Sequence, residues 1–236
     1  MALPKLNDKP KYEVVIPSTQ TKVKFRPYLV KEEKILMIAM ESQDQRQMLN
    51  AVVDTIEACI EQPVKRAKLT VFDVEYLFTQ IRAKSVGETA KVGLKCKECQ
   101  HPNEITVKLD DIKVEIKKVN NTLDLGNNIK LKMQWPMYEG VINIENLNPE
   151  VSTTEQTFDM IIQCIESVQT EDELFNITEE PRDEVIAFIE SLNTQQFMQI
   201  REFVESAPKM THDVNYKCES CGTDNSVVLE GMNDFL

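Results

Sequence analysis

Four cysteines form the pattern in this sequence that most directly indicates chemistry. They lie in two Cys-x-x-Cys motifs, Cys96 with Cys99 and Cys218 with Cys221. Thiolates at this spacing bind zinc, because the two-residue gap lets a tight turn direct both sulfurs at one ion. Two such motifs provide the four ligands of a closed tetrahedral site. The sequence therefore predicts one structural zinc ion per chain, held by all four cysteines.

The sequence around the two motifs is repeated. At a constant offset of 122, Val92, Lys95, Cys96, Cys99, Asn103, Ile105 and Val107 match Val214, Lys217, Cys218, Cys221, Asn225, Val227 and Leu229. Alternating sequence flanks each motif, as is typical of strands. We therefore expect each motif at the tip of a β-hairpin, with the two hairpins forming one split zinc ribbon. The 118 residues between Cys99 and Cys218 make an unusually long separation for such a ribbon.

Other uses of these cysteines stay open. A Cys-x-x-Cys motif can be a redox dithiol, but that motif usually opens a helix, where the dipole lowers a thiol pKa. Two disulfides would suit a secreted protein, but no signal peptide is visible. The thiols could also carry no metal. His101 and His212 flank the motifs and are further candidate ligands, although four thiolates already fill a tetrahedron.

Composition narrows the classes of function. The chain has 236 residues and a net charge of −12, which argues against non-specific binding to nucleic acid or to an anionic membrane and suits a basic protein partner. The longest apolar run, 35–40, is too short to span a bilayer. The sequence has no glycine-rich phosphate loop and no Gly-x-Ser-x-Gly motif. It has only two histidines, which is few for acid–base catalysis. We therefore expect neither an enzyme nor a small-molecule substrate.

Hydrophobic periodicity predicts an α+β fold. The expected segments are an N-terminal arm and hairpin (1–29), a helical cluster (30–88), a strand-rich part with the first motif (89–145), a second helical insert (146–209), and the second motif completing the ribbon (210–236). Cys59 and Cys164 lie in helical patterns and are expected to be buried.

Individual elements follow from the same patterns. Strands are expected at 12–16, 21–28, 90–116 and 129–135, and helices at 31–40, 44–60, 70–85, 157–168, 181–192 and 193–207. The first of these helices should bury Ile35, Leu36, Ala39 and Met40. Loops are expected at 145–154 and, as an acidic turn, at 171–173. The apolar end at 235–236 is expected to dock.

Three separated strings carry a family resemblance. They are Phe25-Arg26-Pro27-Tyr28 followed by Lys31-Glu32-Glu33-Lys34-Ile35-Leu36; 69–78 running on to 82–88; and Tyr216-Lys217-Cys218 with Cys221-Gly222, Leu229-Glu230-Gly231 and Phe235. These strings resemble the baseplate protein family of T4-like contractile-tailed bacteriophages, over essentially the whole chain. In the first motif Gln100 stands where Gly222 follows the second.

The resemblance implies a baseplate hub component or a hub assembly factor without catalytic residues. Its partners would be other phage baseplate and hub proteins, in the virion tail baseplate and, during assembly, in the host cytoplasm. We expect these partners to contact the arm at 1–11, the first hairpin and the acidic loop. Without the resemblance, the alternative is a cytosolic zinc-ribbon adaptor associated with a nucleic-acid machine, although the negative charge disfavours direct contact with nucleic acid.

Overall fold

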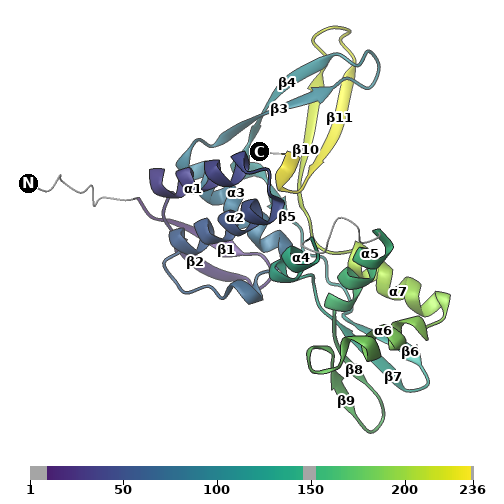
Figure 1. Ribbon diagram of the computed structural model, residues 1–236. Helices are drawn as coiled ribbons and strands as arrows, with labels where there is room; N and C mark the ends of the chain where they lie inside the picture. Colours follow the sequence, from purple (N-terminus) through teal and green to yellow (C-terminus); the bar gives the residue numbers. More distant parts are fainter. Residues whose placement is uncertain (1–9, 146–152, 235–236) are drawn as a thin grey trace, which may run out of the picture. The chain divides into compact units, whose positions relative to one another are not determined.

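The computed structural model describes residues 10–145 and 153–234 (Figure 1). The N-terminal arm lies almost entirely outside this part of the chain, as do most of the expected loop at 145–154 and the apolar end at 235–236. No helix among the described residues combines the length and the apolar character that a membrane crossing requires.

The chain forms two compact units, and helices and strands occur in both. The first unit comprises Met1–Arg66, Phe72–Ile116 and Pro208–Leu236, and the second comprises Ala67–Val71 and Lys117–Ala207. The fold is therefore mixed α and β, and the second unit contains strands expected in the strand-rich part together with helices expected in the second insert.

The first unit begins with the predicted hairpin. Strands β1 (Tyr12–Ile16) and β2 (Thr21–Phe25) pair antiparallel. Their inward-facing side chains are buried, as the alternating pattern predicts: Val14, Ile16, Val23 and Phe25. The turn between the strands is fixed by Asp73, whose buried carboxylate accepts hydrogen bonds from the N–H (2.8 Å) and the hydroxyl (2.6 Å) of Ser18.

Three helices follow in the first unit, as predicted. They are α1 (Val30–Glu41), α2 (Gln45–Cys59) and α3 (Val71–Ser85). Asp44 caps α2 by accepting the Gln47 N–H at 3.1 Å. Hydrophobic side chains of α2 and α3 are fully buried, among them Val53, Ile56, Val74, Leu77 and Ile81. These helices therefore supply much of the core of the first unit.

The inward face of α1 differs from the prediction. Ala39 is buried and Leu36 is half-buried, but Ile35 and Met40 are exposed. The buried face instead includes Glu32, whose carboxylate lies 2.8 Å from the Arg26 guanidinium and accepts the Leu29 N–H at 2.8 Å. This anchor sets the rotation of the helix and leaves an apolar stripe of the sequence in solvent.

The cysteine motifs lie at the tips of two hairpins, as predicted. Strands β3 (Thr89–Lys95) and β4 (Pro102–Lys108) form the first hairpin, and β10 (Met210–Lys217) and β11 (Asp224–Glu230) form the second. The short strand β5 (Lys113–Val114) pairs with β10. A core beneath the hairpins includes Val107, Leu109, Ile112, Met210, Val214, Tyr216 and Leu229. Figure 1 shows the two hairpins side by side.

The second unit is built on an antiparallel sheet in the order β6-β7-β8-β9. Its strands are β6 (Thr122–Gly126), β7 (Ile129–Met133), β8 (Ile165–Gln169) and β9 (Leu174–Asn176). Its helices are α4 (Tyr138–Glu145), α5 (Thr153–Gln163), α6 (Arg182–Glu190) and α7 (Thr194–Glu205). The ring of Trp135 stacks on that of Phe203, with the ring centroids 4.5 Å apart. The core of this unit includes Leu131, Met133, Ile165, Ile189, Ile200 and Phe203.

The predicted helix at 157–168 is wrong beyond Gln163. Helix α5 ends there, and Ile165–Gln169 pairs with β7 and β9 as a strand. Pairing with two neighbouring strands satisfies the backbone groups of this segment and overrides its helical spacing. Helix α4, at 138–145, was not predicted. The starts of α6 and α7 lie close to the prediction, because Pro181 and Asn193 are their N-cap residues.

Candidate metal centre

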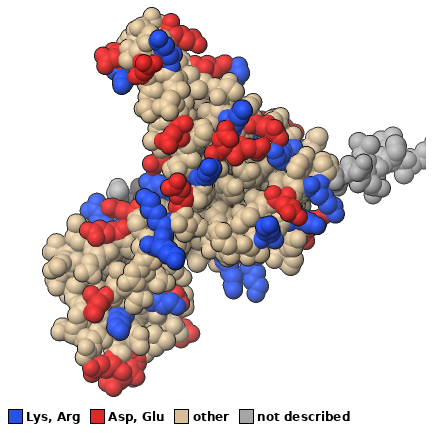
Figure 2. Space-filling view, turned by 180° about the vertical axis from the view of Figure 1, so that it is seen from behind, with Lys and Arg blue, Asp and Glu red and all other residues tan. Residues whose placement is uncertain are grey.

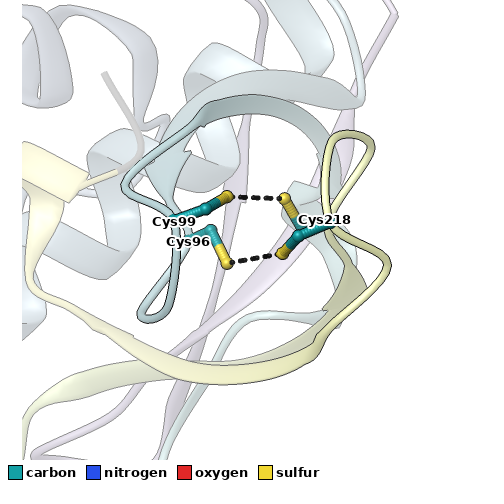
Figure 3. A group of neighbouring side chains, drawn as sticks. Cys96, Cys99 and Cys218 are labelled. Carbon is teal, nitrogen blue, oxygen red and sulfur yellow. Dashed lines mark hydrogen bonds between the residues drawn. The ribbon is translucent and has the colours of Figure 1, made fainter.

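The four cysteine sulfurs converge on one point. All lie within 4.8 Å of one another, and Figure 3 shows them directed toward each other from the two hairpin tips. Across the gap, Cys96 Sγ lies 3.7 Å from Cys221 Sγ, and Cys99 Sγ lies 3.6 Å from Cys218 Sγ. A tetrahedron with Zn–S bonds of about 2.3 Å has edges of about 3.8 Å. The spacing therefore fits four thiolates around a single zinc ion.

The sulfur distances and the backbone around the motifs also bear on the two other uses of the cysteines, as disulfides or as redox dithiols. A disulfide requires sulfur atoms about 2.05 Å apart, and all four cysteines are free. Each motif also follows a strand, β3 or β10, so no helix dipole acts on its first thiol as it does in redox motifs. The arrangement therefore fits a bound metal ion better than a disulfide or a redox dithiol.

Each motif forms the same tight turn, called here a hook (96–99 and 218–221). The N–H of Cys96 donates to the His101 carbonyl at 3.0 Å, and the N–H of Cys218 donates to the Thr223 carbonyl at 2.9 Å. Cys96 and Cys218 are buried, and Cys99 and Cys221 are exposed. The internal repeat of the sequence is therefore a repeat of structure, with the first cysteine of each hook inside and the second facing solvent.

Two buried asparagines connect the hooks crosswise. Asn103 Oδ1 accepts the N–H of Glu219 at 2.9 Å, and Asn225 Oδ1 accepts the N–H of Lys97 at 3.0 Å. Each asparagine stands beside one hook and holds the backbone of the other. The sequence repeat contained both residues at matching positions, but it gave no indication of this role, because the bonds link residues more than a hundred positions apart.

Backbone dipoles prepare two of the thiols to ionise. The N–H groups of Cys99 and Glu98 lower the pKa of Cys96 to about 6, with desolvation opposing them. The N–H of Cys221, followed by that of Ser220, lowers the pKa of Cys218. The His101 N–H lowers the pKa of Cys99, but the neighbouring thiols outweigh it and raise that pKa to about 11. The hooks thus direct partial positive charge at their buried sulfurs.

The flanking histidines do not join the cluster. Among the described residues, the group close enough to share one ion consists of the four cysteines alone. His101 contributes its carbonyl to the hook, and His212 lies in β10 opposite Leu229. Cys59 and Cys164 are buried, as predicted, and burial raises their pKa values to about 11 and about 12.

A comparison with known protein families shows to which one this chain belongs. The sequence model of the family described as T4 bacteriophage base plate protein matches residues 9–236. The chain belongs to this family. The match supports a structural role in a phage baseplate, with other baseplate proteins as partners and the virion tail baseplate as location. No curated protein sequence matches the chain, and no solved structure does.

Proposed function

We propose that the chain is a non-enzymatic component or assembly factor of the baseplate hub of a contractile-tailed bacteriophage, and that one zinc ion stabilises it. The observation that carries the proposal is the family match over residues 9–236. Among the described residues, the four cysteines form the one cluster of candidate metal ligands, and this cluster supports the zinc part of the proposal.

The zinc ion would be held by Cys96, Cys99, Cys218 and Cys221. Four thiolates leave no open coordination position, so the ion could not present a hydroxide for hydrolysis. Its contribution is to folding, because it joins two hairpins more than a hundred positions apart and closes a loop that the small hairpin core could hardly close alone.

Elemental analysis of protein purified without chelator tests the metal. The proposal requires about one zinc per chain, and Cys218→Ser should abolish metal binding and destabilise the hairpins by several kcal/mol. Cys164→Ser is the matched control, because it removes a buried thiol from the second unit. About two zinc ions per chain would show that the hooks bind separately, and none would remove the metal from the proposal.

Mass spectrometry of purified virions and of tail assembly intermediates tests the role. A structural component should be present in both at a fixed ratio to other baseplate proteins. A hub assembly factor should be present in the intermediates and lost from the virion. Absence from both, with the protein found among nucleic-acid enzymes instead, would contradict the baseplate role.

A further inference from the structure

A groove lies in the second unit between helix α6 and the sheet. Its volume is about 270 Å³, and its apolar lining includes buried Val168 and Val185 and half-buried Phe175, Ile177 and Phe188. This volume is below the range of about 300–1,000 Å³ typical of pockets for small molecules. The groove is therefore suited to one apolar side chain of a larger partner.

Two carboxylates, Glu180 and Glu184, also line this groove. Neither forms an ion pair with a cation among the described residues. The segment 170–190 carries eight acidic residues and one basic residue, Arg182, which pairs with Asp159. Figure 2 shows acidic side chains gathered at the tip of the β8–β9 hairpin. A cationic partner would gain from this charge at its approach and at the groove.

Strand β9 provides a way to hold an extended partner. It is the last strand of the sheet, so one of its edges has no strand beside it among the described residues. Phe175 of β9 lines the groove, and Leu174 beside it is 62% exposed. An extended chain added to such an edge gains main-chain hydrogen bonds and places alternate side chains on one face.

We propose that this groove binds an extended basic segment of another protein. The segment would lie along β9, insert one aliphatic or aromatic side chain between α6 and the sheet, and place lysine or arginine against Glu180 and Glu184. That the partner is a baseplate protein rests on the proposed function, whereas the chemistry of the groove does not. The groove also belongs to the second unit and the cysteines to the first, so the two proposals can fail separately.

A short peptide of alternating lysine and valine with a central phenylalanine is the probe, used with the full chain. We expect saturable binding that weakens as the salt concentration rises. The amide chemical-shift changes should be confined to β9, to α6 and to the turn at 170–173 that precedes β9. Two control peptides should not bind: one with glutamate in place of lysine, and one with serine in place of the apolar residues. Binding of either control, no binding of the probe, or shifts spread over both units would overturn the proposal.

Paired glutamate variants separate the groove from general negative charge. The double variant Glu180→Gln with Glu184→Gln should weaken the probe about tenfold, since each rim charge contributes a modest share of the affinity. The control is Glu179→Gln with Glu190→Gln, which removes the same charge at exposed positions outside the groove lining. The control should bind with unchanged affinity. Equal losses in both variants would show attraction to charge alone and would contradict a groove.

Discussion

Gln100 and Gly222 occupy equivalent positions after the two hooks, and their backbones share a left-handed conformation with φ of 59° and 72°. Each N–H donates to the carbonyl of the first cysteine of its hook, Gln100 to Cys96 at 3.0 Å and Gly222 to Cys218 at 2.9 Å. The missing glycine of the first motif therefore does not change the turn. It places a residue with a Cβ atom in a conformation that favours glycine.

Exchanging these two residues should have opposite effects on stability. Gln100→Gly should raise the free energy of unfolding of the zinc-loaded protein by about 0.5–1 kcal/mol, because relief of the left-handed strain exceeds the entropy cost of glycine. Gly222→Gln should lower it by a similar amount and no more, since a Cβ there meets only Lys217 Cε, at an ordinary 3.7 Å. Denaturant unfolding measures both. A loss of stability in Gln100→Gly would show that the Gln100 side chain matters more than its backbone.

Removing the crosswise asparagines should loosen the metal. Asn103→Ala or Asn225→Ala should each weaken zinc affinity about 10–100-fold, as is typical when a group that orients metal ligands is lost. Competition with a chromogenic chelator measures the affinity. Asn215→Ala is the control, because Asn215 is an exposed residue of β10 outside the hook contacts. Equal affinity in all three variants would mean that the cysteines alone position the ion.

Removing the metal should increase amide hydrogen exchange in the first unit more than in the second. Chelation should increase amide hydrogen exchange in β3, β4, β10 and β11, because the two hairpins belong to separate sheets and the metal would join their tips. Exchange in β7 and β8 should stay slow, since Leu131, Met133 and Ile165 belong to a separate core in the second unit. Mass spectrometry of exchanged peptides resolves these segments. Uniform loss of protection would contradict a metal whose role is confined to the hairpins.

Glu32 should make the stability of the folded protein depend on pH in the acid range. Although burial opposes ionisation, the Arg26 guanidinium and the Leu29 N–H lower the pKa of Glu32 from 4.5 to about 2. The ionised carboxylate therefore stabilises the folded state fully above pH 4.5, and this contribution is lost as pH falls toward 2. Glu32→Gln should cost on the order of 2 kcal/mol at neutral pH and flatten this dependence.

Thermal and denaturant unfolding between pH 2 and 7 measure the effect of Glu32. Acid also protonates the cysteine thiolates and releases metal, so the comparison is made in zinc-free protein. Glu33→Gln, at the exposed neighbouring position, is the control and should keep the acid dependence of the parent. An identical pH profile in both variants would refute the assignment to Glu32.

The hooks were predictable because their information is local. Cys96 and Cys99 are separated by a tight turn, and the repeat at Cys218 and Cys221 indicates the same turn a second time. Likewise, the hairpin at Tyr12–Phe25 follows from alternation, and α7 follows from its Asn193 cap. Such elements depend on residues that are close in the sequence.

Elements that depend on distant partners were missed. Ile165 and Val168 fit a helical period as well as a strand, and only pairing with β7 decides between them. Helix α4 contains Gly140, a poor helix former, at a site where an added Cβ would lie 1.7 Å from Gln163 Oε1. The groove beside α6 was not predicted either, because its walls come from β7, β8, β9 and α6 together.

The separation of the hooks sets an order of events during synthesis. Cys99 precedes Cys218 by 119 positions, so at bacterial elongation rates the first hook leaves the ribosome roughly ten seconds before the second. Until then it is a half-site with two thiolates. The segment 117–207, which supplies most of the second unit, is synthesised within that interval. If zinc binds as proposed, its capture by four thiolates marks a nascent chain whose intervening unit has already been made.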